Sequence, residues 1–283
     1  MLFPQALIRR ESDDTLSAAL CSPAFETGWH TRAVAVCAAF SADPPSNNLP
    51  ATLFVQRLDR NHLMIVRTQA EAKASVGPSR FHLLIVSQRD YAALQCDPFA
   101  IADQVAPNWT AAHELPDFEW QGPTPPRRSI ADVQQVLKGQ NGPELLGGCQ
   151  ALIDGSQLLF LRSEPDSKVV RNIWMLLPYS NRQELMPSTF AWNNKLRFDI
   201  VVTTGDRTGN FAGYMTEVQA GGYPEGRYEL SLQTAAEAED QESLEVLWSR
   251  RSRREVWRLG FLLVAVLAIL AVALRIMTPS PKP

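Results

Sequence analysis

The sequence predicts a mixed α+β (or α/β) fold, with a soluble cytoplasmic body followed by a helical stalk and one C-terminal transmembrane helix. Short runs of β-branched and aromatic residues in the first half are typical of strands. Capped helical patterns alternate with further strands after residue 128. The chain then ends on an uninterrupted apolar run behind a cluster of arginines. About 250 residues ahead of that run are enough to bury a substantial core.

The first part, residues 1–105, is expected to be an α+β unit. Apolar runs bounded by turn residues predict strands within residues 4–10, 51–58, 63–68 and 80–87. Residues 30–42 have helical composition, and a further helix is expected to begin at Gln88. Residues 106–128 contain five prolines and no sustained period, which predicts a proline-rich linker or loop.

The second part, residues 129–226, carries clearer helix boundaries. Ser129 is expected to cap one helix, and Asn141 precedes a second helix with Pro143 in its first turn. The pair Pro165 and Asp166 opens a third helix, which Pro178 ends. Strands are predicted within residues 157–162 and 196–204, so this half reads as a second α/β part.

Residues 227–256 predict a helical stalk with juxtamembrane arginines. Five carboxylates lie between Glu237 and Glu245 and the arginines follow, an order that the helix dipole favours. The apolar stripe of Leu244, Leu247 and Trp248 is narrow, so the helix is expected to be solvated. A chain ending near Thr234 is therefore expected to fold without it.

Residues 257–277 predict the transmembrane helix, with a short tail over 278–283. No charged or polar side chain occurs between Leu259 and Leu274, about 24 Å of helix, and the flanking residues extend it to about 31 Å. The alternative is a buried core helix, but this run is apolar on every face. With no signal-peptide pattern at the start, the chain is expected to be anchored by its tail.

Charge around this run predicts the orientation. The arginines that precede it are Arg250, Arg251, Arg253, Arg254 and Arg258, whereas only Arg275 and Lys282 follow. The positive-inside rule then places the body in the cytoplasm, at a bacterial inner membrane that the chain crosses once. The remaining body is acidic, so the bilayer, and not nucleic acid, is the expected partner of these arginines.

No motif predicts catalysis, a cofactor or a metal site. The chain lacks a phosphate-binding G-x-x-x-x-G-K-[ST] loop and a G-x-S-x-G nucleophile elbow. The four cysteines form no C-x-x-C pair and the histidines are scattered. His82 alternates with apolar residues, which is typical of a strand residue. A hydrolytic site assembled from distant residues remains the alternative.

Four segments carry a resemblance to a known family: residues 4–8 (PQALI), 77–85 (GPSRFHLLI), 145–155 (LLGGCQALIDG) and 172–203. Over about residues 4–204 the chain resembles the N-terminal and middle domains of the bacterial GTPase-associated protein family. A glycine-rich stretch of that family is replaced by RRESDDTLSA here. The resemblance implies an accessory protein that acts through protein contacts, with a GTPase as the candidate partner.

The predicted function is therefore a tail-anchored, non-catalytic adaptor or regulatory subunit of a GTPase-associated membrane system. The alternatives are a membrane-tethered hydrolase and a purely structural subunit. The candidate contact residues are Arg80, His82, Arg182 and Thr189. The last two lie in the turn over residues 177–192, which either presents them to a partner or is part of the fold, with Trp192 in the core and Arg182 a solvated helix end.

Overall fold

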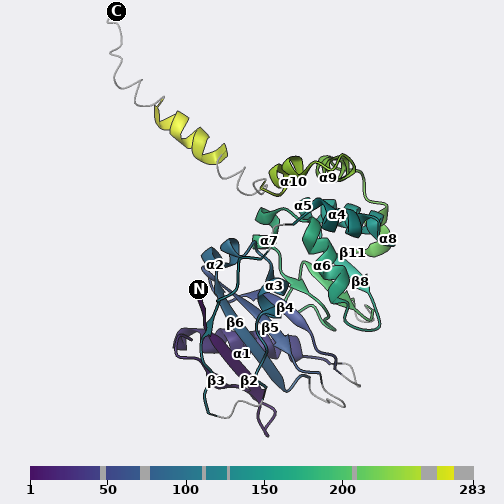
Figure 1. Cartoon of the computed structure of the whole chain (residues 1–283). Coiled ribbons are helices and arrows are strands. Elements are labelled where there is room, and N and C mark those ends of the chain that lie inside the picture. The colour runs from purple at the N-terminus through teal and green to yellow at the C-terminus, as the bar shows by residue number, and fades with distance from the viewer. Residues whose placement is uncertain are drawn as a thin grey trace, which may run out of the picture.

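The structure is a computed structural model that describes residues 1–44, 49–70, 77–109, 113–125, 128–205, 209–249 and 260–270. Within these residues, one sheet of nine strands runs through both predicted parts, in the order β11-β8-β10-β9-β4-β5-β6-β2-β3 (Figure 1). A separate antiparallel pair joins β1 to β7. The strands are β1 (Leu2–Phe3), β2 (Gln5–Arg10), β3 (Leu16–Cys21), β4 (Leu53–Arg57), β5 (His62–Thr68), β6 (Arg80–Ser87), β7 (Phe118–Glu119), β8 (Leu158–Leu161), β9 (Pro187–Ser188), β10 (Ile200–Thr203) and β11 (Met215–Thr216).

The sheet changes character in its middle. Strands β4, β5, β6, β2 and β3 pair antiparallel, whereas β9, β10, β8 and β11 pair parallel. The two halves are joined where Phe54 of β4 lies antiparallel to Ser188 of β9. The α+β class is thus confirmed, and the sheet has no break between the two predicted parts.

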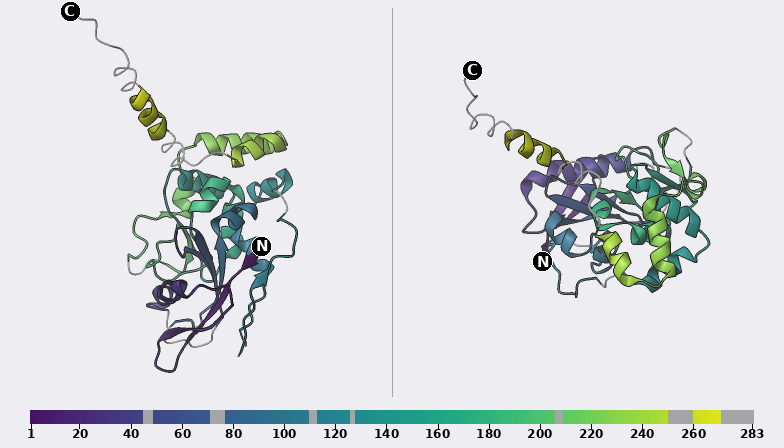
Figure 2. Two further views of the ribbon diagram at one scale, coloured as in Figure 1. Left: turned by 90° about the vertical axis from the view of Figure 1, so that its left-hand side faces the viewer. Right: turned by 90° about the horizontal axis from the view of Figure 1, so that it is seen from above.

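Helices cover both faces of the sheet (Figures 1 and 2). Helix α1 packs Val36 and Phe40 against Phe54 and Phe81 on one face, and α2 and α3 cover the other face of the antiparallel half. Around the parallel half, α4, α5, α6, α8, α9 and α10 share one apolar cluster. The helices are η1 (Thr27–Trp29), α1 (His30–Ser41), α2 (Gln88–Ala93), α3 (Pro98–Asp103), α4 (Ile130–Leu137), α5 (Gly142–Ile153), α6 (Ser167–Leu176), α7 (Tyr179–Glu184), α8 (Glu217–Gly221), α9 (Arg227–Glu237) and α10 (Gln241–Trp248).

Side-chain caps explain where several helices begin. Ser129 and Asp132 form a capping box at α4, and the Asp166 carboxylate accepts from the Val169 N–H at α6. Asn141 precedes α5 without a side-chain capping hydrogen bond, and its amide nitrogen donates to Glu217 Oε1 (2.8 Å). The predicted start points are therefore right for these helices, although one of them begins without the expected cap.

The last turn of α6 is closed by side chains from elsewhere in the chain. Its carbonyls at Trp174 and Met175 accept from Arg182 Nε (2.7 Å) and Arg128 Nη1 (2.6 Å). The Tyr228 hydroxyl donates to Leu176 O (2.6 Å). Cations are favoured at this end of a helix dipole, so two buried arginines hold α6 in place, and neither forms an ion pair with a carboxylate of the described residues.

Each helix in the described part of the predicted stalk buries one face in the core. In α9, Tyr228 and Leu232 are buried, and in α10 Leu244 and Trp248 are 0% and 1% exposed. The Arg128 guanidinium lies 4.0 Å from the Trp248 ring centre. The prediction of a solvated helix was wrong here, because the narrow apolar stripe meets a matching surface on the body while the carboxylates face outward.

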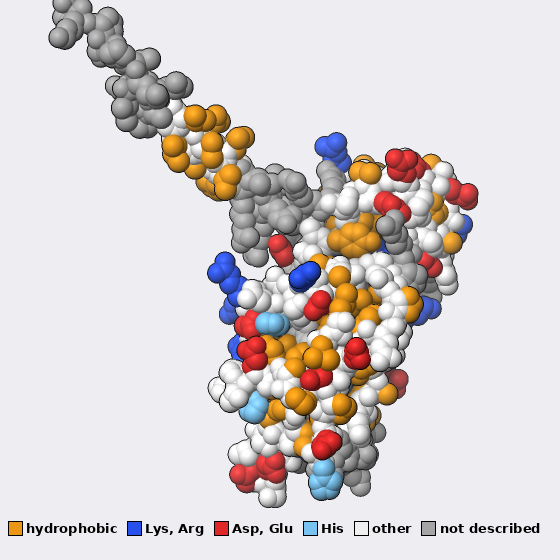
Figure 3. Space-filling view, turned by 60° about the vertical axis from the view of Figure 1, so that its left-hand side comes forward, with side chains coloured by type: hydrophobic (Ala, Val, Ile, Leu, Met, Phe, Trp, Pro, Cys, Tyr) orange, Lys and Arg blue, Asp and Glu red, His pale blue; other side chains and the backbone are white. Residues whose placement is uncertain are grey.

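The prediction of a transmembrane helix over residues 257–277 needs correction. In this region the structure describes residues 260–270, and they form a helix. Its apolar side chains are exposed (Figure 3). Among all described residues, no helix combines the length and the apolar character needed to span a membrane. The rest of the predicted span lies outside the described residues, as do Arg250, Arg251, Arg253, Arg254 and Arg258.

Candidate functional site

Basic side chains from three neighbouring strands lie on the face of the sheet that α3 covers. Arg9 of β2 is the register partner of Arg80 of β6, and Arg67 of β5 is the partner of His82. Arg9 and Arg80 both donate to the carbonyl of Trp109, each at 3.4 Å. Side chains directly opposite on adjacent strands are close neighbours. Positive charge therefore accumulates at this end of the three strands.

A cavity of about 390 Å³ opens beside these residues, between the two halves of the molecule. We call it the sheet-edge cavity. Its walls include Arg67, Phe99, Trp109, Ser167, Arg171 and Thr189. The end of β9 and the start of α6 meet here, at the carboxyl ends of the parallel strands, which is where open α/β sheets commonly bind ligands.

Arg67 and Arg171 give this cavity its charge. Burial lowers the pKa of Arg67 to about 10, against the opposing attraction of Asp103, so this guanidinium is charged at neutral pH. Its Nη1 donates to Ala102 O (2.9 Å). Arg171 instead holds the Asp103 carboxylate through two hydrogen bonds of 2.7 and 2.8 Å. Arg67 therefore forms no ion pair with a described carboxylate, and its positive charge remains at the cavity.

His82 is buried beside Arg67 and is neutral. Its Nε2 lies 2.7 Å from Gln5 Oε1, while Gln5 Nε2 donates to Pro116 O (2.7 Å). The glutamine oxygen can only accept, so His82 Nε2 carries the hydrogen and Nδ1 is an acceptor. Burial, and then the charge of Arg67, lower the pKa of His82 to about 3. This histidine is held in the fold, and no serine or cysteine in the described part of the chain is hydrogen-bonded to it.

The four predicted contact residues have different surroundings. Arg80 and His82 lie next to Trp109, and Thr189 lines the sheet-edge cavity. Thr189 is nevertheless 3% exposed, and its hydroxyl donates to Leu53 O and accepts from Leu53 N. Arg182 is 2% exposed and caps α6, so it is neither presented to a partner nor a solvated helix end. Three of the four gather at one place, and Arg182 does not.

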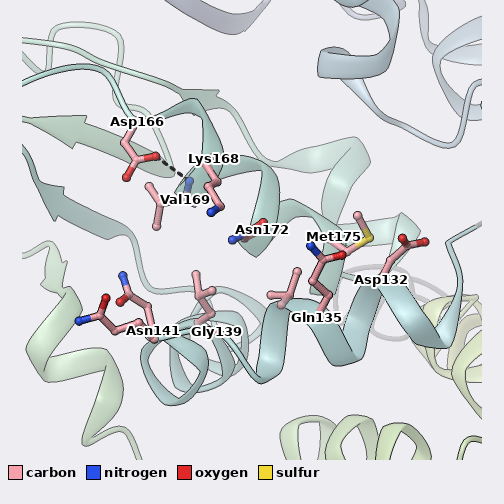
Figure 4. Close-up of a pocket in the computed structure, with 12 residues that line it drawn as sticks. Asp132, Gln135, Gly139, Asn141, Asp166, Lys168, Val169, Asn172 and Met175 are labelled. Atoms are coloured by element: carbon pink, nitrogen blue, oxygen red, sulfur yellow. Dashed lines mark hydrogen bonds between the residues drawn. The ribbon is translucent and has the colours of Figure 1, made fainter.

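A second hollow, of about 410 Å³, lies on the other side of α6. We call it the amide groove, since it is lined by four carboxamide side chains, those of Gln135, Gln140, Asn141 and Asn172. Figure 4 shows Lys168, Asn172 and Met175 of α6 on one side, with Gln135 of α4 and Asn141 opposite them. Asp132, Asp166 and Lys168 add charge of both signs.

The carboxamides of Gln135 and Asn172 make no hydrogen bond to any residue that the structure describes. Each carboxamide both donates and accepts. The peptide group of an extended chain needs the same pairing. The amide groove can thus form hydrogen bonds with a peptide backbone, whatever the charge of the peptide's side chains.

One nucleophile and base pair is close in space. Cys21 Sγ of β3 lies 3.2 Å from His30 Nε2 at the start of α1. Burial raises the pKa of the Cys21 thiol, which disfavours the thiolate that would act as nucleophile. No group of three or more His, Cys, Asp or Glu side chains suited to a metal ion occurs among the described residues.

No protein-family model matches this chain. A search of curated proteins likewise finds no relative. The resemblance to GTPase-associated proteins accordingly stays a prediction.

Sequence reasoning missed Arg67, Arg171, Gln135 and Asn172. Arg9, Arg67 and Arg80 each stand at the end of a predicted strand, and that is the signal that was available. The register that places them side by side follows from pairing between distant strands, which a single sequence does not reveal.

Proposed function

We propose that this chain is a non-catalytic adaptor or regulatory subunit that binds an extended segment of a partner protein in the amide groove. The observation that carries the proposal is the pair of carboxamides from Gln135 and Asn172, which face the groove from two helices. Recognition of an extended peptide rests on main-chain hydrogen bonds. A GTPase is the first partner to test, because of the resemblance of residues 4–204.

The helices that build this groove are firmly held. Helix α4 is capped by Ser129, and α6 is capped at its start by Asp166 and at its end by Arg128 and Arg182. Between them, Val136, Leu145 and Val169 are buried in the same apolar cluster. A rigid frame lowers the entropy cost of binding, which supports a site for recognition.

The test is affinity capture with the full chain as bait. Gln135→Leu and Asn172→Leu should each reduce recovery of a reproducible partner, and the double variant should abolish it, since buried peptide groups would lose their hydrogen bonds. Gln121→Leu is the matched control, because Gln121 is an exposed carboxamide outside the groove. If the double variant recovers as much partner as the natural chain, the amide groove is not the binding site.

The hydrolase alternative has one observation in its favour, the 3.2 Å approach of Cys21 to His30. It predicts ester or thioester hydrolysis that Cys21→Ser and His30→Gln both abolish. The adaptor proposal expects these two variants to capture the partner as the natural chain does.

A further inference from the structure

Helix α10 is held on the body by a narrow contact. Leu244 and Trp248 are buried in the apolar cluster, and Leu247 is half-buried against it. The residues on the opposite side of the helix are exposed: Glu242, Ser243, Glu245 and Val246. A helix of this length is not stable in water by itself. The helical form of α10 therefore depends on its contact with the body.

Gln241 joins α10 to the start of α4. Its Oε1 accepts from the Ile130 N–H (3.0 Å), and its Nε2 donates to Arg128 O (3.0 Å). The first N–H groups of a helix have no acceptor within the helix itself, so Gln241 supplies one to α4. Because α4 carries Gln135 into the amide groove, α10 supports one wall of that groove.

Trp248 joins α10 to the end of α6 through Arg128. The Arg128 guanidinium lies 4.0 Å from the Trp248 ring centre, and its Nη1 donates to Met175 O (2.6 Å) and Leu177 O (2.7 Å). Met175 and Asn172 line the other wall of the amide groove. Helix α10 thus supports both walls, although none of its described residues lines the groove.

The turn between α9 and α10 contains a residue in a strained conformation. Glu239 has a φ of 55°, which is unfavourable for residues other than glycine. Its N–H donates to Ala236 O (3.4 Å), and the next N–H, of Asp240, donates to Ala235 O (2.9 Å), a helix end at which glycine is the usual residue. Such strain persists where the surrounding structure fixes it, and the docked α10 does so here.

We propose that α10 (Gln241–Trp248) is a detachable clasp. When it is docked, it holds α4 and α6 at the spacing of the amide groove. When it detaches, the strain at Glu239 is relieved and the two walls of the groove can separate. The consequence for recognition rests on the proposed function: binding of the partner segment and docking of α10 then favour each other, since coupling between two sites is reciprocal.

Hydrogen exchange of the full chain without a partner, measured at several low urea concentrations, tests the clasp. The urea dependence of an opening increases with the surface that the opening exposes. Amides of α10, of the first turn of α4 and of the last turn of α6 should share one opening, with a smaller urea dependence than amides of β5 and β6. The Ile130 N–H is the most direct reporter, because its acceptor belongs to Gln241.

Two substitutions at Glu239 change the docking of α10 without touching its contacts or the groove, because the Glu239 side chain is exposed. Glu239→Pro should speed exchange in α10 and at the Ile130 N–H by about tenfold or more, since proline fixes φ near −65° and removes an N–H. Glu239→Gly is the matched variant. It should slow the same amides by about threefold, because glycine adopts a positive φ without strain.

Gln241→Leu is a second way to weaken the clasp if Glu239→Pro does not fold. It removes both hydrogen bonds to the start of α4 and should speed exchange in α10 and α4 by about tenfold. Gln233→Leu is its control, because Gln233 is an exposed carboxamide of α9 that donates to Glu237 of the same helix (2.9 Å). This control should leave the exchange of α10 unchanged.

The same urea dependence in α10 as in β5 and β6 would mean that α10 opens only with the whole fold, and it would overturn the proposal. Faster exchange of α10 alone, with α4 and α6 unchanged in both weakening variants, would overturn the link to the groove. So would exchange that neither variant changes. These measurements use no partner, so a failed capture test would remove the partner segment and leave the clasp standing.

Discussion

Arg182 shows how a charged side chain is used as a structural cap. It is 2% exposed and donates to Trp174 O (2.7 Å) and Gln95 O (3.2 Å). Burial lowers its pKa, and the nearby charge of Asp97 opposes that shift. The guanidinium therefore joins the end of α6 to the turn after α2.

Arg182→Ala is expected to lower the free energy of unfolding by about 3 kcal/mol, because two buried carbonyls lose their donor and a cavity forms. Urea denaturation measures this. Arg60→Ala, at an exposed position, should change stability by less than about 0.5 kcal/mol. Equal effects of the two substitutions would show that the buried hydrogen bonds contribute nothing.

His82 makes stability depend on pH in the acid range. Its pKa is lowered to about 3 in the folded chain, whereas an unfolded histidine titrates near 6.5. Below pH 6.5 the unfolded chain binds the proton and the folded chain does not, so this stability is present above pH 6.5 and is lost as pH falls toward 3.

The slope is expected to be about 1.4 kcal/mol per pH unit between pH 6 and 4 from this residue alone. His82→Gln should reduce the slope of unfolding free energy against pH by that amount in the same interval. An unchanged slope in the variant would mean that other groups cause the acid sensitivity.

The sequence around His82 predicted its place in the fold, whereas the sequence around Arg182 did not. The alternation around His82 correctly indicated a strand residue, but only Nε2 of its ring is hydrogen-bonded, to Gln5, while the buried Nδ1 has no partner among the described residues. Arg182 follows Pro178 and precedes polar residues, so its sequence context resembles a solvated helix end. Its burial depends on Gln95 and on the end of α6, which come together only in the folded chain.

Helix α10 illustrates the same point for an element. Its Trp248 is 1% exposed, and the Arg128 guanidinium lies between the Trp248 ring (4.0 Å) and the Tyr179 ring (4.5 Å). Leu244 packs in the same cluster. Removal of α10 would expose this surface, so a chain that ends near Thr234 is now expected to be destabilised.

Trp248→Ala is expected to cost about 3–5 kcal/mol in unfolding free energy, the range for a large buried aromatic side chain. Val246→Ala is the control on the same helix, because Val246 is 62% exposed and should change stability little. A Trp248→Ala chain that unfolds at the same urea concentration as the natural chain would restore the view of α10 as a separate stalk.

Elements with strong local signals were predicted well. The β-rich runs predicted β5 and β6 close to their observed bounds. Ser129 correctly marked the start of α4, and Pro178 lies just after the end of α6. The strand β3 was missed, because its small residues carry little β-propensity and its stability comes from pairing with β2. The two-residue strands β9 and β11 are likewise defined by their neighbours.

At the scale of the molecule, one sheet joins what the sequence suggested were two parts. The junction between β4 and β9 depends on a pairing of residues more than a hundred positions apart, for which the sequence contains no local signal. This junction brings α6 beside α3. It thereby places the sheet-edge cavity on one side of α6 and the amide groove on the other.

The central claim is that the amide groove binds the partner protein. Hydrogen exchange of the full chain, measured with and without the captured partner, tests it most directly. The claim predicts slower exchange in α4 and in α6, around Gln135 and Asn172, with the edge strand β3 unchanged. Protection confined to β3, or to any surface that leaves α4 and α6 unprotected, would contradict it.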